Sequence, residues 1–432
     1  MKRIFSVLLT IAMLLACLSV PALAEPVVLQ FWGAIPPENG PQEVVDIWNA
    51  AHPDIQVEYT RFVNDDAGNT KLETALLAGE VDVFINYPAG ALDKRVEAGL
   101  MIPLDDYLAK DGIDLVETWG ESNHYRNGKC YFVPSNGGND AYLIYNKDIV
   151  DAAGVTIPDR WTWEEFEATV AKLTSGAGPE KVYGLTGGYS VVGDDWAFGA
   201  KHEIGNDYMY KSETESNFDH PAFLRDMKVR YQMEVEDETM IPRLEVKMTN
   251  LDVPTEFANG KIAMIWGNYH VRDMKNLEKY PHDFKIGFAP VPMNEDQETF
   301  YFTGVREWVA ISPSCETPDA AWEFVKYFST EGFYPMCKSG RLPAWRGADS
   351  AKAVAYYLGD QAEELFDTES FNKYVMKSPY AASLVNRISV AQSELVNLMG
   401  EAREAVMLGE MTPEEAIAQL KIDADAAIAN AK

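Results

Sequence analysis

The residues best suited to chemistry in this chain are aromatic and polar side chains that follow strand-like runs or lie in loops. They are Trp32, Asn86 with Tyr87, Asp195 with Trp196, Trp266 with Tyr269, and Arg341 with Trp345. Aromatic rings offer flat apolar faces for stacking, while amide, carboxylate, hydroxyl and guanidinium groups give or accept hydrogen bonds. Because clefts in α/β proteins form where strands end, we expect these side chains to meet in one cleft. The combination suits sugars, which present flat C–H faces and a ring of hydroxyl groups.

Ordinary structural roles compete with this interpretation at several positions. Asn86, Tyr87 and Tyr269 are equally compatible with turns, while Asp195 and Asp140 could be solvated acids and Arg341 could merely pair with one of them. The tryptophans at strand ends and in loops favour a ligand instead. Three further tryptophans lie in helical patterns and are interpreted as core residues, namely Trp48, Trp163 and Trp322.

The motifs of common hydrolases and metalloenzymes do not occur in the sequence. It contains no G-x-S-x-G turn for a nucleophilic serine and no H-E-x-x-H pair for zinc. A phosphate-binding loop and a calcium loop of EF-hand spacing are absent as well. A carboxylate pair for glycoside hydrolysis stays open, because the sequence does not show which of 67 acidic residues face each other. We expect neither a cofactor nor a metal.

Strand-like and helical runs alternate along the chain and must position these residues. Strands are predicted at Val27–Phe31, Ile55–Tyr59, Val81–Ile85, Tyr142–Tyr145, Val182–Thr186, Ile262–Ile265 and Glu307–Ile311. Helices are predicted from Pro41 (Val44, Ile47, Trp48 and Ala51 inward), about Lys71–Ala78, from Pro318 (Ala321, Phe324, Val325 and Phe328 inward), and after capping boxes at Thr162 and Thr412. This rhythm predicts an α/β fold with mainly parallel strands in at least two lobes.

The N-terminus predicts export from the cytoplasm. Lys2 and Arg3 precede an apolar run, and Ala22-Leu23-Ala24 forms a cleavage site, so residues 1–24 are predicted to be a signal peptide. Acylation of Cys17, giving a lipoprotein, is the less favoured alternative. The apolar run is shorter than the roughly 20 residues of a membrane-spanning helix.

The amino-acid composition limits the classes of molecule that the protein is expected to bind. The 432 residues include 67 acidic and 37 basic side chains, a formal net charge of -30. Removing 24 residues that carry two positive charges would leave 408 residues and a charge of -32, which disfavours binding to nucleic acid. Three cysteines would remain, Cys130, Cys315 and Cys337, and we expect buried thiols, with a disulfide between Cys315 and Cys337 as the alternative.

Several segments, in order, resemble one family. After a strand that ends in Phe31-Trp32, the likeness is carried by Leu77–Phe84 (with Val81 where the family usually has proline), Glu97–Leu104, Gly128–Pro134, Leu143–Val150, Trp161–Phe166, Phe257–Met264 and Ala320–Phe328. Together they resemble the extracellular solute-binding proteins of ABC importers, in the sugar-binding group that includes the maltose-binding proteins. Each fragment is weak alone, but the series spans nearly the whole mature chain.

The resemblance implies a type II periplasmic-binding-protein fold, with two α/β lobes joined by a hinge and a ligand cleft between them. By analogy the N-terminal lobe covers residues 25–138 plus 292–330 and the C-terminal lobe 139–291 plus 331–432. Hinge strands are expected near Asn139–Leu143 and Ile286–Pro292. The family places sugar contacts in the loops named above and at the first crossing, which adds Asn139 and Asp140. Closure of the lobes produces the form that the membrane permease recognises.

The leading hypothesis is an exported, monomeric, non-enzymatic protein that captures a mono- or oligosaccharide for an ABC transporter permease. One alternative is a binding protein for a polyamine or another cation, with Asp140, Asp194 and Asp195 as counter-charges and tryptophan as the cation–π wall. A less favoured alternative is a secreted glycosidase or lyase.

Overall fold

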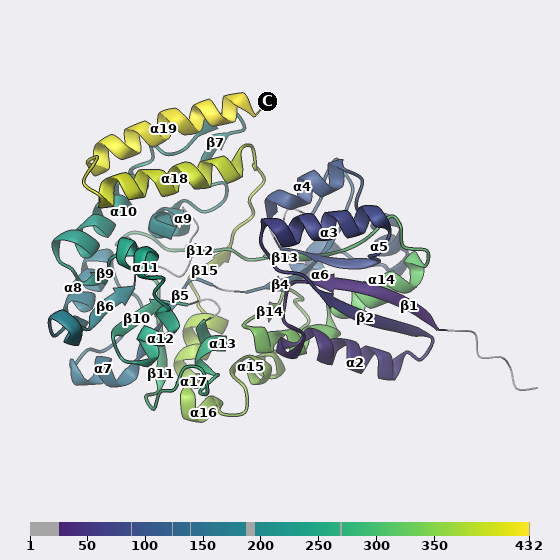
Figure 1. Ribbon diagram of the computed structural model, residues 1–432, viewed down its shortest axis with the longest axis horizontal. Helices are drawn as coiled ribbons and strands as arrows, with labels where there is room; N and C mark the ends of the chain where they lie inside the picture. Colours follow the sequence, from purple (N-terminus) through teal and green to yellow (C-terminus); the bar gives the residue numbers. More distant parts are fainter. Residues whose placement is uncertain are drawn as a thin grey trace, which may run out of the picture.

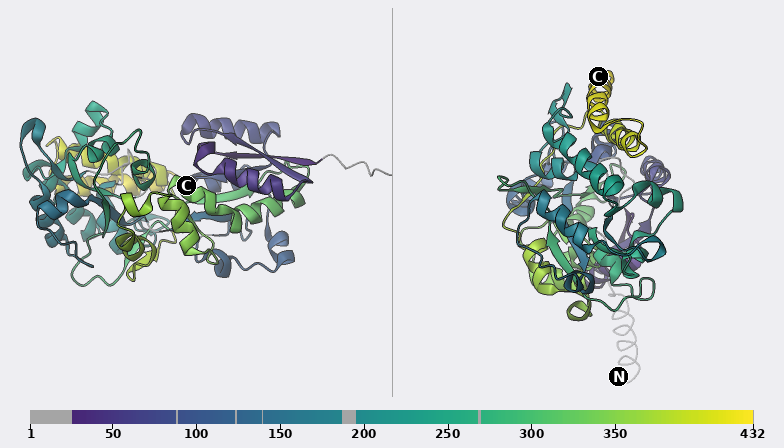
Figure 2. Two further views of the ribbon diagram at one scale, coloured as in Figure 1. Left: turned by 90° about the horizontal axis from the view of Figure 1, so that it is seen from below. Right: turned by 90° about the vertical axis from the view of Figure 1, so that its left-hand side faces the viewer.

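The protein is described from a computed structural model that covers residues 26–87, 89–122, 124–138, 140–186, 195–267 and 270–431. The side chains of residues 89–91, Asp195 and Lys247 are not described. The predicted signal peptide and Cys17 therefore lie outside the described residues. Figures 1 and 2 show two lobes side by side, with the N-terminal lobe on the right of Figure 1.

The first lobe is built on a six-stranded sheet in the order β14-β4-β13-β3-β1-β2. Its strands are β1 (Val27–Gly33), β2 (Ile55–Arg61), β3 (Val83–Asn86), β4 (Val133–Gly137), β13 (Glu307–Ile311) and β14 (Leu342–Pro343). Strands β1, β2 and β3 are parallel, whereas β13 runs antiparallel to both β3 and β4. The start of β13 therefore lies at the same edge of the sheet as the carboxyl ends of β1 and β3.

Helices cover both faces of this sheet. They are α2 (Pro41–Ala51), α3 (Asp66–Ala78), α4 (Ala89–Glu97), α5 (Asp105–Asp111), α6 (Leu115–Trp119) and α14 (Pro318–Phe328). Phe31 of β1 packs against Phe324 and Phe328 of α14 with ring centroids 5.1 and 5.0 Å apart. The predicted inward face of α14 is confirmed, because Ala321, Phe324, Val325 and Phe328 are all buried. For α2 the prediction is wrong at two positions: Ile47 (45% exposed) and Ala51 are exposed, and Val45 is buried instead.

The second lobe contains a five-stranded sheet in the order β11-β5-β10-β6-β9. Its strands are β5 (Tyr142–Asn146), β6 (Tyr183–Thr186), β9 (Met240–Ile241), β10 (Ile262–Trp266) and β11 (Ile286–Pro290). Around it lie α7 (Lys147–Ala152), α8 (Trp163–Leu173), α9 (Phe198–Ile204), α10 (Pro221–Tyr231), α11 (Arg243–Thr249), α12 (Val253–Ala258), α13 (His270–Met274), α15 (Ser350–Leu358), α16 (Ala362–Leu365) and α17 (Thr368–Phe371). The predicted capping box that starts α8 is present, with Thr162 and Glu165 hydrogen-bonded reciprocally.

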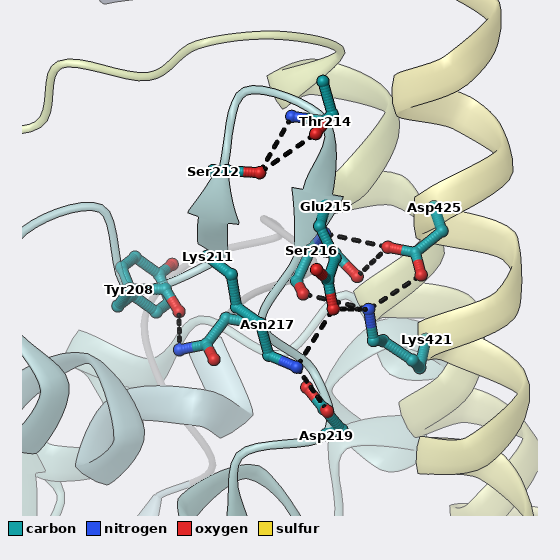
Figure 3. A network of polar contacts seen from close by, with 10 residues as sticks. All are labelled: Tyr208, Lys211, Ser212, Thr214, Glu215, Ser216, Asn217, Asp219, Lys421 and Asp425. Carbon is teal, nitrogen blue, oxygen red and sulfur yellow. Dashed lines mark hydrogen bonds and ion pairs between the residues drawn. The ribbon is translucent and has the colours of Figure 1, made fainter.

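Two long C-terminal helices form an extra layer on the second lobe. These helices, α18 (Gln392–Met407) and α19 (Pro413–Asn430), share an apolar core with α9 and α10, and α19 begins with the predicted capping box at Thr412. The hairpin of β7 (Tyr210–Ser212) and β8 (Glu215–Ser216) is tied to α19 by a polar network (Figure 3). In it Lys421 Nζ lies 2.7 Å from Asp425 and donates to the carbonyl oxygen of Ser216 at 3.1 Å. This network helps to fix the helix pair.

The chain passes between the lobes more than once. It leaves the first sheet after β4, returns between β11 and β13, and on that return forms β12 (Phe300–Phe302), which pairs with β15 (Ala381–Ser383). Residues 331–343 differ from the expected division, which assigned them to the C-terminal lobe. The 3₁₀ helix Glu331–Ser339 packs on α2, and β14 pairs with β4 in the first sheet. The third passage therefore follows Pro343.

The three described cysteines are free and buried, so the alternative of a disulfide between Cys315 and Cys337 is wrong. Burial raises the pKa of Cys130 and of Cys337 to about 12. Within the described ranges, no helix combines the length and the apolar character needed to cross a bilayer.

Candidate functional site

A cavity of about 470 Å³ lies between the two lobes and is lined by residues from both. The first lobe contributes Tyr87 after β3, the start of β13, and Arg341 before β14. The second lobe contributes Lys201 of α9 and Gln392 of α18, among others. A larger cavity of about 820 Å³ lies by α13 and α15, but no residue predicted as a ligand contact lines it. We therefore take the 470 Å³ cavity, hereafter the interlobe cavity, as the candidate site.

An ion pair forms one wall of the interlobe cavity. Arg341 Nε donates to Glu307 Oε1 at 2.6 Å, and both side chains are buried. The second carboxylate oxygen of Glu307, Oε2, is buried and has no hydrogen-bond partner among the described residues. The neighbouring indole N–H of Trp308 is likewise buried without a partner. One acceptor and one donor on consecutive residues of the cavity lining thus have no partner among the described residues, and a hydroxyl-rich ligand could satisfy both.

Tyr87 presents a neutral phenol to the same cavity. Its hydroxyl oxygen accepts a hydrogen bond from the backbone N–H of Ala34 at 2.6 Å. Burial raises the pKa of Tyr87 well above its usual value, and the Glu307 carboxylate raises it further. The hydroxyl therefore keeps its proton and can donate it in a hydrogen bond.

A polar cluster around Thr303 connects α9 to the returning chain. Asp140 accepts hydrogen bonds from the backbone N–H and the hydroxyl of Thr303 at 2.8 and 2.6 Å, and Arg306 Nη1 lies 3.7 Å from its carboxylate. Lys201 Nζ donates to the Thr303 hydroxyl oxygen at 2.8 Å. Burial alone would raise the pKa of Asp140, but the charges of Lys201 and Arg306 and the Thr303 hydrogen bonds lower it below the usual range. Asp140 therefore stays ionised and stabilises the neighbouring positive charges of Lys201 and Arg306 at the cavity.

His202 follows Lys201 and is buried behind the cavity wall. Its ring hydrogen-bonds the carbonyl oxygen of Tyr301 through Nδ1, and its centroid lies 3.9 Å from that of Phe198. Burial lowers the pKa of His202 to about 3, and the neighbouring Lys201 charge acts in the same direction. The imidazole is therefore neutral near pH 7.

The residues predicted from sequence are only partly brought together. Tyr87 and Arg341 line the interlobe cavity, and Asp140 supports it from behind. Asn86 is fully buried, with its side-chain oxygen accepting from Arg95 Nη1 at 2.8 Å. Trp32 is buried in the apolar cluster to which Trp308 belongs.

The remaining predicted residues are placed elsewhere or are not described. Trp196 is inside the core shared with α18, and its Nε1–H donates to the Met399 carbonyl oxygen at 2.9 Å. Trp266 packs on Phe198, with centroids 4.2 Å apart, and Trp345 lines a separate cavity of about 330 Å³. Asn139, Asp194 and Tyr269 lie outside the described residues, as does the side chain of Asp195.

Sequence reasoning missed most of the cavity lining, including the polar residues Lys201, Arg306, Glu307 and Trp308. Glu307–Ile311 was predicted as a strand, and two adjacent charges at the start of an apolar strand are a usable signal. What the sequence lacks is the direction of β13 in the sheet, which brings its start to the cavity edge.

Among the described residues, no group of three or more His, Cys, Asp or Glu side chains is arranged to hold a metal ion. The polar groups of the interlobe cavity are instead amides, hydroxyls, guanidinium groups, one ammonium and one carboxylate. Such groups bind by hydrogen bonding and charge.

Comparison with known sequences points to one family. Residues 34–333 match the family model described as bacterial extracellular solute-binding protein. An uncharacterized lipoprotein of Streptomyces antibioticus is 32% identical over 180 residues, 40% of this chain and 39% of the relative. The maltotriose-binding protein of Pyrococcus abyssi is 24% identical over 299 residues, 67% of this chain and 59% of the relative. The matches thus span less than two thirds of either relative.

Among solved structures, the chain is similar to an ABC substrate-binding protein from Listeria monocytogenes in complex with cycloalternan. The TM-score is 0.72 at 21% identity, and the match covers 94% of this chain and 99% of the other. This likeness confirms the predicted fold, in which two α/β lobes are joined by a hinge.

Proposed function

The chain belongs to the family of bacterial extracellular solute-binding proteins, and from that premise we propose that it captures a mono- or oligosaccharide in the interlobe cavity and delivers it to an ABC transporter permease. The observation that carries this proposal is the wall formed by Glu307 and Trp308. There a carboxylate oxygen and an indole N–H are buried without hydrogen-bond partners among the described residues, in a lining that also contains Tyr87 and Tyr208. Because buried polar atoms are seldom left unpaired, such atoms indicate a ligand that supplies the missing hydrogen bonds.

The chemistry of the lining agrees with a sugar. Tyr87, Tyr208 and Trp308 supply aromatic surface, and Asn64, Asn386 and Gln392 supply amides that both donate and accept. The relatives support the same class of ligand, since one is named for maltotriose and another was solved with cycloalternan. Of the residues predicted from sequence, we retain Tyr87 and Arg341 as direct contacts and Asp140 as a support.

Export and the transporter partner are part of the same proposal. The basic start, apolar run and small-residue cleavage site support secretion, and the lipoprotein relative supports a location outside the cytoplasm. A protein of this family delivers its solute rather than converting it, so we propose no catalytic residue.

The cationic-ligand alternative has less support. Of the described residues that line the interlobe cavity, four carry cationic side chains and one carries a carboxylate. Asp140, the counter-charge suggested for a polyamine, is already engaged by Thr303 and Arg306. A polyamine would meet repulsion there.

A thermal-shift screen tests the proposal. Residues 25–432 would be measured with neutral and acidic saccharides, polyamines and amino acids at matched ionic strength. A ligand that binds only the native state at 100 times its Kd stabilises it by about 2.7 kcal/mol, which raises the Tm of a chain this size by several degrees. We expect a rise with one class of saccharide. A rise with polyamines alone would contradict the proposal.

A second measurement separates binding from turnover. The saccharide that gives the largest shift would be titrated calorimetrically, and the mixture would be followed by mass spectrometry for a day. We expect one-to-one binding and an unchanged saccharide. Sustained release of shorter products would show an enzyme.

A further inference from the structure

The charge of the interlobe cavity is opposite to the charge of the chain. Over the whole sequence, acidic residues outnumber basic ones by 67 to 37. Among the described residues that line the cavity the ratio is reversed, because Arg126, Lys201, Arg306 and Arg341 are cationic and Glu307 is the one carboxylate. A cleft lined mainly by one sign of charge, with walls of low-dielectric protein, focuses its electrostatic potential on the ligand that enters.

Carboxylates behind the lining balance only part of this charge. Arg341 pairs with Glu307, Arg306 lies 3.7 Å from Asp140, and Arg126 forms an ion pair with Asp93. Within the described ranges, these ion pairs thus join three acids to three of the four cations. Among the described residues no carboxylate forms an ion pair with Lys201, whose ammonium donates to the Thr303 hydroxyl.

The cations also come from both sides of the cavity. Arg126 and Arg341 belong to the first lobe, Lys201 projects from α9 of the second, and Arg306 lies on the returning chain. Like charges that approach across a closing, poorly hydrated space repel one another. A neutral sugar would leave that repulsion in place, whereas an anion between the lobes would convert it into attraction.

From this arrangement we propose that the saccharide bound in the interlobe cavity carries an anionic group, a carboxylate or a sulfate, and that Lys201 and Arg306 recognise it. The inference rests on the proposed function and names the substrate class within it. Guanidinium groups suit such anions because they bind two oxygens at once. Glu307 and Trp308 would then bind the hydroxyl groups of the same ligand.

Matched pairs of ligands test the charge directly. The full mature chain would be titrated with oligogalacturonates and their methyl esters, with glucuronate- and mannuronate-containing oligomers, with sulfated disaccharides, and with neutral malto- and manno-oligosaccharides. We expect one acidic family to bind at least about tenfold more tightly than its neutral counterpart. Its affinity should fall as NaCl rises from 50 to 500 mM. The acidic family that binds identifies the anion.

The outcomes separate the two proposals. If neutral sugars bind as tightly as acidic ones, the anionic inference falls while saccharide capture stands. If no saccharide binds, or only polyamines do, both fall.

A pair of lysine substitutions tests the recognition. Lys201→Gln should weaken the acidic ligand at least about tenfold and leave any residual binding insensitive to salt. Lys181→Gln is the matched control: it removes the same charge from the second lobe, where Lys181 pairs with Glu238 at 2.8 Å outside the cavity, and should leave affinity unchanged. Lys201→Arg should retain most of the affinity, which would show that folding is intact. Equal weakening of acidic and neutral ligands by Lys201→Gln would overturn the assignment.

Discussion

Two polar networks of this protein differ in what they leave unpaired. In the network between the β7–β8 hairpin and α19, Lys211 and Lys421 are each held by carboxylates, and these carboxylates are exposed (Figure 3). In the wall of the interlobe cavity, Glu307 and Trp308 are buried, and each has one polar atom that finds no partner in the part of the chain that the structure describes. The exposed network ties two elements together, whereas the buried one is incomplete until something enters. A binding site is therefore distinguished from a structural network by its unsatisfied hydrogen-bonding groups and not by the number of its charges.

The largest effect on stability is expected when Arg341 is removed from the wall of the interlobe cavity. Arg341→Ala leaves the Glu307 carboxylate buried without its partner, so we expect a loss of about 3–5 kcal/mol in the free energy of unfolding. Urea denaturation measures it. The double variant Arg341→Ala/Glu307→Gln should recover part of the loss, because it removes the uncompensated charge. A single variant as stable as the wild type would show that the pair is not buried in solution.

The pH dependence of stability tests whether His202 is buried behind the cavity wall. Its pKa is lowered to about 3 in the folded protein, whereas an unfolded histidine titrates near 6.5. The unfolded state therefore binds the proton more tightly, and stability falls as the pH drops below about 6.5, by up to about 1.4 kcal/mol per pH unit until about pH 3. His202→Gln should flatten this slope. Stability curves of equal slope between pH 7 and 4 would contradict the burial.

Two tryptophan variants sharpen the comparison by separating binding from stability. Trp308→Phe removes an indole N–H that has no hydrogen-bond partner among the described residues, so we expect unchanged stability and about tenfold weaker saccharide binding. Trp196→Phe removes one that donates to Met399, so we expect a loss of about 1 kcal/mol in stability and unchanged affinity. Calorimetric titration and urea denaturation of both variants provide the test. The reverse pattern would place the site at Trp196.

The smallest effect is expected in the exposed network. Lys421→Met breaks contacts with Asp425 and Glu215, yet exposed ion pairs are worth at most about 1 kcal/mol. We expect a change in Tm of a few degrees at most and no change in affinity. A large loss would mean that this network does more than fasten the hairpin.

Local features were predictable from the sequence, and the arrangement of the site was not. The capping boxes at Thr162 and Thr412 depend on residues three positions apart, and the apolar face of α14 depends on a single turn period. Glu307 escaped notice because its role depends on where β13 inserts in the sheet. Trp196 was assigned to the ligand because its contact with Met399 spans some two hundred residues, which no local pattern records. The resemblance predicted the two lobes, but Tyr87 and Arg341 are the only predicted contacts that line the interlobe cavity among the described residues.

The insertion of β13 between β3 and β4 also determines when, during synthesis of the chain, the first sheet can be completed. Strands β1 to β4 emerge from the ribosome early, but until Ile311 has been made the sheet has a gap where β13 belongs, with β3 and β4 each lacking a neighbour. Unpaired strand edges are open to wrong partners. The first lobe therefore cannot be completed as a nascent domain, although it begins the chain. We propose that the protein leaves the cytoplasm, and the late completion of the first sheet would then help to keep this lobe unfolded, and so competent for export, during most of its synthesis.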